Sequence, residues 1–179
     1  MRRFYKLEQE YDKTFYAEVD DKYEFDFWEE KMYRLPLEYS HKFKMKNGDT
    51  MPDFTYTNIC SCIYSKKFKN LINEFVSQNE IEWIHLQVIN KDNSISDAYY
   101  PRFIPIPHMF DVLDEERTIL TDHGDIMIPY LSAEKTRDKH FIILLENQLY
   151  VYVSAELKKA IQKAKITGVR KFIKARMDI

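Results

Sequence analysis

The stretch that decides the fold of this chain is its last thirty residues, YVYVSAELKKAIQKAKITGVRKFIKARMDI, from Tyr150 to Ile179. It opens on the extended run 150–153. Ser154 follows, and its short side chain can accept a hydrogen bond from the free N–H groups that begin a helix. Four apolar residues then recur at i, i+3, i+4 and i+7, which places them on one helical face: Leu157, Ala160, Ile161 and Ala164. Gly168 ends this helix, and residues 169–173 can return as a strand. The stretch therefore predicts a strand, a serine-capped helix, a turn and a second strand.

The same pattern occurs once more, further upstream. Ser65 precedes four apolar residues at the same helical spacing: Phe68, Leu71, Ile72 and Phe75. The similarity is short, so it indicates two uses of one strand-to-helix pattern rather than a duplicated repeat, because repeat folds need several regularly spaced units. Lys66 and Lys67 fill the first helical turn, where positive charge opposes the helix dipole at a cost of about 0.3 to 1 kcal/mol. Such a choice can mark a binding surface or can simply be tolerated.

Extended runs elsewhere predict a chain rich in strands. They are residues 2–7, 42–46, 51–57, 82–89, 97–106, 126–131, 141–145 and 148–153. Asn47-Gly48-Asp49 predicts a hairpin between the second and third runs, and the polar residues 90–94 predict one between the fourth and fifth. Prolines at 101, 105 and 107 make the fifth run an edge strand or end it early, because each proline removes a ladder donor.

The runs 141–145 and 148–153 predict the most convincing hairpin, with Glu146-Asn147 at its turn. Their consecutive apolar residues imply burial on both faces, so we expect this hairpin to be the central pair of the sheet. The two helices are expected at about residues 65–76 and 154–165. Together these elements predict an α+β fold, a mostly antiparallel sheet with both helices packed against it.

Length and composition fit a single domain over residues 1–179. Hydrophobic residues make up 45% of the chain and charged residues 31%, a balance that excludes a disordered chain. The 13 tyrosines and 12 phenylalanines against 3 glycines favour sheet faces and core, and they also allow an aromatic binding surface.

No targeting or membrane segment is expected. The basic N-terminal residues lack an apolar stretch behind them, which excludes a signal peptide. The longest purely apolar run, Phe141–Leu145, is far too short for a membrane span. A disulfide between the closely spaced Cys60 and Cys62 would be strained, and no second cysteine pair completes a zinc site. Free thiols and a cytoplasmic location are therefore expected.

Charge is distributed unevenly, although the net charge is only −2. Residues 17–30 carry a net charge of −6 with aromatic residues interleaved, and residues 156–179 carry +6. The two ends could face each other or could simply be solvated, since surface ion pairs are weak. A dedicated nucleic-acid binder would usually have a basic overall balance, which this chain lacks.

Asp111, Asp114 and His123 form the best enzyme-like grouping, because carboxylates and an imidazole can hold a metal ion. A helical turn over 111–116 would place Asp111, Asp114 and Glu115 on one face, but acids at a helix start are also favoured by the helix dipole. Nucleophile elbows and phosphate-cradling loops are missing. A metal-dependent hydrolase stays an alternative, as does a nucleic-acid-associated module that uses the basic C-terminal residues Lys158, Lys159, Lys163, Arg170 and Lys174.

Several short motifs follow one another in a recognisable order. They are Pro52-Asp53-Phe54, Ser65-Lys66-Lys67-Phe68-Lys69, Asp111-Val112-Leu113-Asp114, Ser154-Ala155-Glu156-Leu157-Lys158 with Ala160-Ile161, and Ile166-Thr167-Gly168-Val169. By their order and spacing the chain resembles the immunity-protein family of bacterial polymorphic toxin systems, formerly a domain of unknown function named after a myxobacterial member. The motifs lie in a family-like core, residues 49–179, and residues 1–48 form a variable N-terminal subregion.

The resemblance implies a non-enzymatic protein that binds and neutralises a cognate bacterial toxin, with no cofactor. It does not say which residues touch the toxin. From the residues themselves we hypothesise that the acidic segment complements a basic toxin, with acids that steer association and aromatics that anchor it. The partner-binding residues of this hypothesis are Asp20, Asp21, Tyr23, Glu24, Asp26, Trp28, Glu29 and Glu30.

Overall fold

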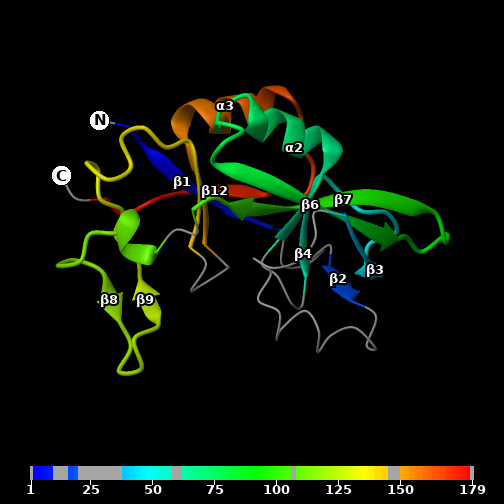
Figure 1. Cartoon of the computed structure of the whole chain (residues 1–179), viewed down its shortest axis with the longest axis horizontal. Coiled ribbons are helices and arrows are strands. Elements are labelled where there is room, and N and C mark those ends of the chain that lie inside the picture. The colour runs from blue at the N-terminus through cyan, green and yellow to red at the C-terminus, as the bar shows by residue number, and fades with distance from the viewer. Residues whose placement is uncertain are drawn as a thin grey trace.

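The computed structural model describes residues 2–9, 16–19, 38–57, 62–105, 108–144 and 150–177. Its strands form a four-stranded sheet, a closed six-stranded barrel and a two-stranded hairpin. Helices α2 (Lys66–Asn73) and α3 (Ala155–Lys163) lie side by side above the sheet and the barrel, and the hairpin projects to the lower left (Figure 1). The α+β class and the mostly antiparallel pairing predicted from the sequence are confirmed.

The four-stranded sheet has the order β10-β11-β1-β12 and is antiparallel throughout. Its strands are β10 (Phe141–Ile143), β11 (Val151–Ser154), β1 (Phe4–Glu8) and β12 (Lys171–Lys174). The N-terminal strand thus lies between the two strands of the C-terminal stretch: Phe4 pairs with Ser154 on one side and Tyr5 with Lys174 on the other. The final strand begins two residues later than the sequence predicts.

The predicted hairpin of β10 and β11 is confirmed, with Phe141 opposite Val153. Its placement as the central pair was wrong, because β10 lies at the edge of the sheet and β1 shares the centre with β11. β10 is nevertheless buried on both faces. Phe141 packs toward the helices, and Ile142 packs on the opposite side against Leu113. The helices and the residues around Leu113 cover the two faces of β10, so this edge strand is as apolar as a central strand would be.

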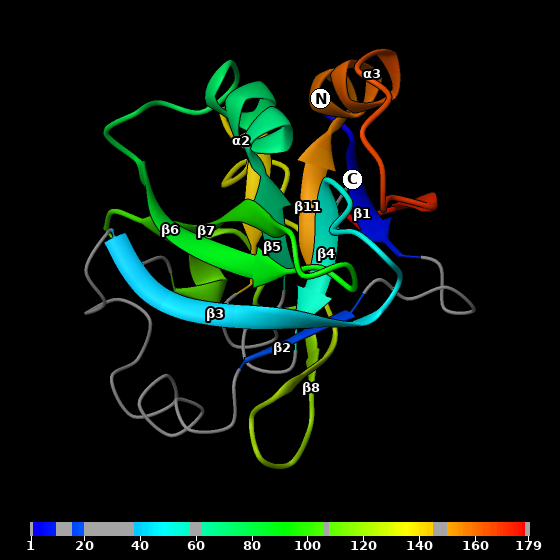
Figure 2. The same ribbon diagram turned by 90° about the vertical axis from the view of Figure 1, so that its right-hand side faces the viewer.

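The barrel closes in the order β2-β3-β6-β7-β5-β4. Its strands are β2 (Tyr16–Val19), β3 (Glu38–Asn47), β4 (Phe54–Thr57), β5 (Cys62–Ser65), β6 (Ile81–Ile89) and β7 (Ile95–Phe103). Two junctions are parallel, β2 with β4 and β3 with β6. Alternate residues of β6 point inward, so that Ile84, Leu86 and Val88 pack on Phe43 in an apolar interior. The strand ring faces the viewer in Figure 2.

Two expectations about the barrel strands were wrong in part. The turn at Asn47-Gly48-Asp49 does not close a hairpin, because β2 lies between β3 and β4. The β6–β7 hairpin is confirmed, but β7 is paired on both sides and is not an edge strand. Pro105 acts by the other predicted route, since β7 ends at Phe103, just before Ile104-Pro105. Pro101 lies inside β7 opposite Trp83, and Pro107 lies outside the described residues.

Both serine caps are confirmed, although each helix is shorter than predicted. The Ser65 hydroxyl accepts a hydrogen bond from the Phe68 N–H at 3.2 Å, and Ser154 accepts one from the Leu157 N–H at 3.1 Å. The helices bury Phe68, Ile72, Leu157 and Ile161 in one core, which also holds Tyr64 of the barrel and Phe141 of the sheet. The rings of Tyr64 and Phe141 lie 5.9 Å apart, so the barrel and the sheet are packed together directly.

The chain between residues 108 and 139 forms a small lobe under the other face of the sheet. It contains a 3₁₀ turn, η3 (Met109–Asp111), and the hairpin of β8 (Ile119–Leu120) and β9 (Ile126–Ile128). Val112, Leu113 and Leu131 bury their side chains against Phe4 and Ile142 of the sheet. The sheet is therefore sandwiched between the two helices and this lobe. Among the described residues, no helix is both long and apolar enough to cross a bilayer.

Candidate functional site

Three of the five motifs that carry the family resemblance meet at one place, which we call the clasp: Asp53, Ser65, Lys67, Thr167 and Gly168. Asp53 is its centre. One carboxylate oxygen accepts a hydrogen bond from the Ser65 hydroxyl at 2.5 Å, and the other accepts from the Thr167 N–H and hydroxyl at 2.9 and 3.0 Å. The Lys67 ammonium lies 3.6 Å from Asp53 and donates to the Lys165 carbonyl at 3.1 Å. The clasp thus ties the start of α2 to the loop that follows α3.

Gly168 lets this loop approach β4 closely. The Phe54 N–H donates to the Thr167 carbonyl at 3.1 Å. Gly168 has a φ of +85°, and a Cβ on it would lie 2.2 Å from the Phe54 carbonyl oxygen. The side-chain amide of buried Gln9 also donates to that oxygen, at 2.6 Å. Only glycine fits such a crowded, left-handed position. Here the motif residues hold the fold together.

The clasp also changes the ionisation of Asp53. Burial by itself would raise the pKa of this carboxyl, but the hydrogen bonds from Ser65 and Thr167 and the nearby Lys67 charge favour the ionised form, and the net effect lowers the pKa. Asp53 is therefore a permanent anion at neutral pH. Its charge is held by the protein and not offered to a ligand.

The enzyme-like grouping predicted from the sequence lies in the lobe and is dispersed there. Asp111 accepts a hydrogen bond from the His108 N–H at 2.7 Å, and Asp114 accepts from the N–H groups of Glu116 and Arg117, both at 3.0 Å. The predicted helical turn over 111–116 is absent, because the 3₁₀ turn ends at Asp111. His123 lies in the exposed turn between β8 and β9. Within the part of the chain that the structure describes, no three acidic, histidine or cysteine side chains are placed to hold a metal ion.

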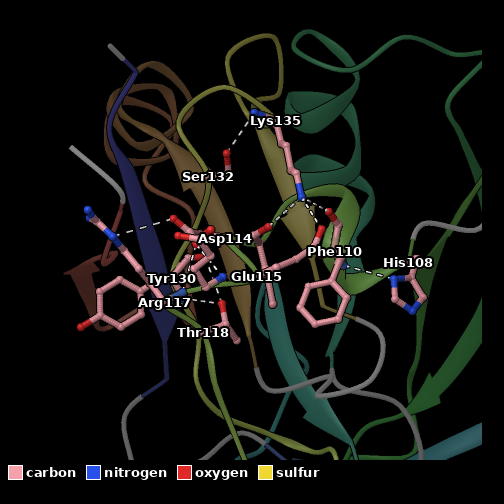
Figure 3. A network of polar contacts seen from close by, with 11 residues as sticks. His108, Phe110, Asp114, Glu115, Arg117, Thr118, Tyr130, Ser132 and Lys135 are labelled. Carbon is pink, nitrogen blue, oxygen red and sulfur yellow. Dashed lines mark hydrogen bonds and ion pairs between the residues drawn. The ribbon is translucent and has the colours of Figure 1, made fainter.

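Lys135 organises the base of the lobe, a role that no sequence pattern indicated. Its ammonium donates to the carbonyls of Phe110 at 2.9 Å and Leu113 at 3.2 Å, and to the Glu115 carboxylate at 3.0 Å (Figure 3). Together with the turn that Asp114 closes, these bonds fix the chain just before β8. The acidic run 111–116 therefore forms a turn that is held in place by hydrogen bonds.

The hairpin on this base presents apolar side chains to solvent. Ile119 is 47% exposed and Met127 is 56% exposed. Between the hairpin and the sheet lies an open groove, which we call the tyrosine groove. Its lining residues include Lys6, Met127, Tyr150, Tyr152, Ile173, Lys174 and Arg176. Exposed apolar groups beside a groove are typical of surfaces that bind a partner.

Cations and tyrosines meet in the tyrosine groove. The rings of Tyr150 and Tyr152 stack at 6.1 Å, and the Lys6 ammonium lies 4.2 Å from the Tyr150 ring centroid. Burial lowers the pKa of Lys6 and raises the pKa of Tyr152. A second depression, around Arg3, Tyr130 and Met177, shares Lys174 and Arg176 with the first. Among the described residues, those that line the two depressions include basic side chains and no carboxylate, so this side of the sheet favours an acidic partner.

The basic residues singled out from the sequence do not form one patch. Lys158 lies 3.8 Å from the Tyr5 ring centroid and 5.2 Å from that of Phe172, so it covers the helix side of the sheet. Lys159 and Lys163 are exposed on α3, and Lys174 is exposed on β12. The Arg170 N–H bonds the Glu8 carbonyl at 2.9 Å. All eight predicted partner-binding residues of the acidic segment, 20, 21, 23, 24, 26 and 28–30, lie outside the described residues.

Comparison with protein families agrees with the resemblance seen in the motifs. A profile described as "Immunity protein family (Imm11)" matches residues 4–176. The chain therefore belongs to the Imm11 immunity protein family. The match includes the N-terminal strand β1, which showed no family motif by inspection. A search of curated proteins gave no match.

Proposed function

We propose that this protein neutralises a cognate bacterial toxin by forming a tight stoichiometric complex with it, without a chemical step of its own. The observation that carries the proposal is the family match, which covers residues 4–176 and so nearly the whole chain. Membership of an immunity family implies a toxin as partner. The tyrosine groove and the neighbouring depression offer a basic surface on which a toxin could dock.

The acidic segment stays the sequence-based candidate for first contact. Residues 17–30 carry −6 with Tyr23 and Trp28 among the acids, a composition suited to steering a basic toxin and then anchoring it. Complementary charge acts mainly on the association rate, because it raises the frequency of productive encounters.

Co-expression tests the proposal directly. The toxin domain encoded beside this protein's gene should arrest growth when expressed alone, and growth should recover when this chain is expressed with it. The purified pair should elute as one complex with a fixed stoichiometry. Arrest that continues despite full expression of this chain contradicts the proposal.

Charge reversal tests the acidic segment separately. Asp20→Lys, Asp21→Lys and Asp26→Lys together should slow association with the toxin about tenfold or more at low salt, and the difference should shrink as salt screens the charges. A control with the same change in net charge reverses the exposed residues Asp49, Glu74 and Glu134 instead. Equal association rates for the two triple variants would sink the assignment to residues 20–30.

A further inference from the structure

We infer that the outer edge of β12 accepts an extended, acidic segment of the toxin as an additional strand of the four-stranded sheet. This inference rests on the proposed function and names how the toxin is held. Among the described residues, no strand pairs with the outer side of β12. Exposed strand edges carry unpaired backbone donors and acceptors that another chain can use.

The hydrogen bonds of β12 show which of its residues are free to pair. Ala175 donates its N–H to the Phe4 carbonyl at 2.9 Å, and Lys6 lies opposite Ile173 in the ladder. In an antiparallel pair, successive residues alternate between facing the partner and facing away. The backbone groups of Ile173 and Ala175 therefore face β1, and those of Phe172 and Lys174 face outward.

The next outward residue shows that this edge can bind a strand. The carbonyl of Arg176 accepts a hydrogen bond from the Leu131 N–H at 2.9 Å, and Leu131 forms a parallel bridge with Met177. The lobe has thus added itself to the same edge just beyond β12. Next to this bridge, the outward-facing backbone groups of Phe172 and Lys174 remain available to pair with a strand.

Charge around the edge selects the partner's chemistry. Lys174 and Lys171 are exposed on β12, and Lys158 lies over the Phe172 ring on the helix side of the sheet. Lys6 and Arg176 line the tyrosine groove on the other side. Glu8, opposite Lys171, is the acid in this ladder. A strand added at this edge would have cations of this protein near both of its faces. Carboxylates on either face of the added strand could therefore form ion pairs.

The same lysines argue against a second copy of this chain as the occupant. Two β12 edges placed together would bring Lys171 and Lys174 of one copy against those of the other, and like charges on adjacent strands are destabilising. Lysines are also a common protection of sheet edges against unwanted strands. An acidic segment is not repelled by these lysines, because its carboxylates form favourable charge pairs with them.

Two substitutions at one position separate backbone pairing from charge. Lys174→Ala removes the ammonium and keeps the N–H, whereas Lys174→Pro removes both, and proline is tolerated where a strand N–H faces solvent. With the toxin domain as probe, we expect Lys174→Ala to weaken binding about threefold. We expect Lys174→Pro to weaken it about tenfold further, the value of one lost hydrogen bond. Equal affinities of the two variants overturn the inference.

Hydrogen exchange of the unaltered protein gives a readout that does not depend on any variant folding. In the free protein, the Phe172 and Lys174 amides should exchange quickly and the Ile173 amide slowly, because only the last is bonded to β1. In the toxin complex all three should be slow. Fast exchange at Phe172 and Lys174 in a formed complex overturns the edge pairing and leaves the proposed function intact.

Two further outcomes distinguish failure of the edge pairing from failure of the proposed function. If the unaltered chain does not bind the toxin domain at all, the proposed function falls and the edge pairing falls with it. A single-stranded oligonucleotide serves as a second probe, since cations beside tyrosines can also bind nucleic acid. Tight binding of the oligonucleotide, weakened equally by Lys174→Ala and Lys174→Pro, would assign the edge to nucleic acid and overturn the inference.

Discussion

The two serine-capped helices begin alike but are anchored by different chemistry. At α2, Ser65 caps the helix and donates to the Asp53 carboxylate at 2.5 Å. At α3, Ser154 caps the helix while its hydroxyl lies 2.8 Å from Nδ1 of His140, beside an acidic first-turn residue, Glu156. One anchor is an anion and the other a neutral ring. The capping pattern therefore decides where a helix starts, and the tertiary partner of the serine decides how that start responds to mutation and pH.

The presence of an anion, Asp53, at the start of α2 explains why a positive charge is found there. Lys67 opposes the helix dipole, but its ammonium is 3.6 Å from Asp53 and donates to the Lys165 carbonyl. Both partners lie outside α2, so the unfavourable interaction of Lys67 with the helix dipole is offset by these long-range contacts. Of the two interpretations open from the sequence, a binding surface or a tolerated charge, neither includes this structural role.

The largest expected effect comes from filling the close approach at the clasp. Gly168→Ala places a Cβ 2.2 Å from the Phe54 carbonyl at a φ of +85°, so the loop after α3 must move away from β4. We expect the free energy of unfolding in urea to fall by about 3 kcal/mol or more. Gly124→Ala is the control, since Gly124 has the same φ of +85° with no heavy atom within 4 Å of the added Cβ. Its cost should stay near 1 kcal/mol, roughly the strain of the left-handed backbone. Equal losses would show that the clasp is not crowded.

The next effect tests the anion at the centre of the clasp. Asp53→Asn keeps the shape of the side chain but removes the charge that Ser65, Thr167 and Lys67 stabilise. We expect a loss of about 2 kcal/mol in the free energy of unfolding. Asp92→Asn is a suitable control, because Asp92 is an exposed turn residue whose carboxylate accepts from the N–H and hydroxyl of Ser94 within its own loop. A loss at Asp53 no larger than at Asp92 would contradict the central role of the carboxylate.

A smaller effect compares the two capping serines. Removing an N-cap hydroxyl costs about 1 kcal/mol, and this loss should be common to Ser65→Ala and Ser154→Ala. Ser65→Ala should cost more, because it also leaves an oxygen of the Asp53 carboxylate without its donor. The double variant of Ser65→Ala and Asp53→Asn should therefore be less destabilised than the sum of the two single variants. Additive losses would mean that the two residues act independently.

The smallest effect is a difference in the pH at which each anchor weakens. Burial and the Arg2 charge lower the pKa of His140 below 6.5, so the stability that neutral His140 contributes is present above pH 6.5 and is lost as the pH falls through the folded-state pKa. The pKa of Asp53 is lowered from 3.8, so its contribution is lost only as the pH falls below 3.8. Urea unfolding at intervals between pH 7 and pH 3 should show the His140 loss first, and His140→Asn should remove it. An unchanged pH profile in His140→Asn would contradict this order.

The sequence could predict the features that depend on neighbouring residues. Ser65 and Ser154 were identified as caps because a cap and its helix lie within a few residues of each other. The β6–β7 hairpin was found for the same reason, since residues 90–94 contain both its turn and its polar pattern. The acids at 111–116 fit both a metal site and a helix start by sequence, and the structure shows a third arrangement, a turn closed by Asp114 and held by Lys135.

The surface proposed to bind the toxin was harder to predict from the sequence. Lys6 and Tyr150 are 144 positions apart, yet they meet in the tyrosine groove. The clasp joins Asp53 to Thr167 over 114 positions. No local pattern encodes such a contact, because each residue is equally plausible on a solvated surface. The motif residues that revealed the family turned out to hold the fold, and their role gave no indication of the surface that meets a toxin.

By itself the sequence determined the helix starts, the two apolar helix faces, the α+β class and the family. Only the tertiary structure decided that β1 lies between β11 and β12, that six strands close into a barrel, and that β12 is left at an open edge. The physical reason is that a cap or a periodic face is stabilised within one segment, whereas a strand gains its partner from whichever distant segment best buries both. The last thirty residues specified two strands and a helix, and the first eight residues decided how those strands were joined.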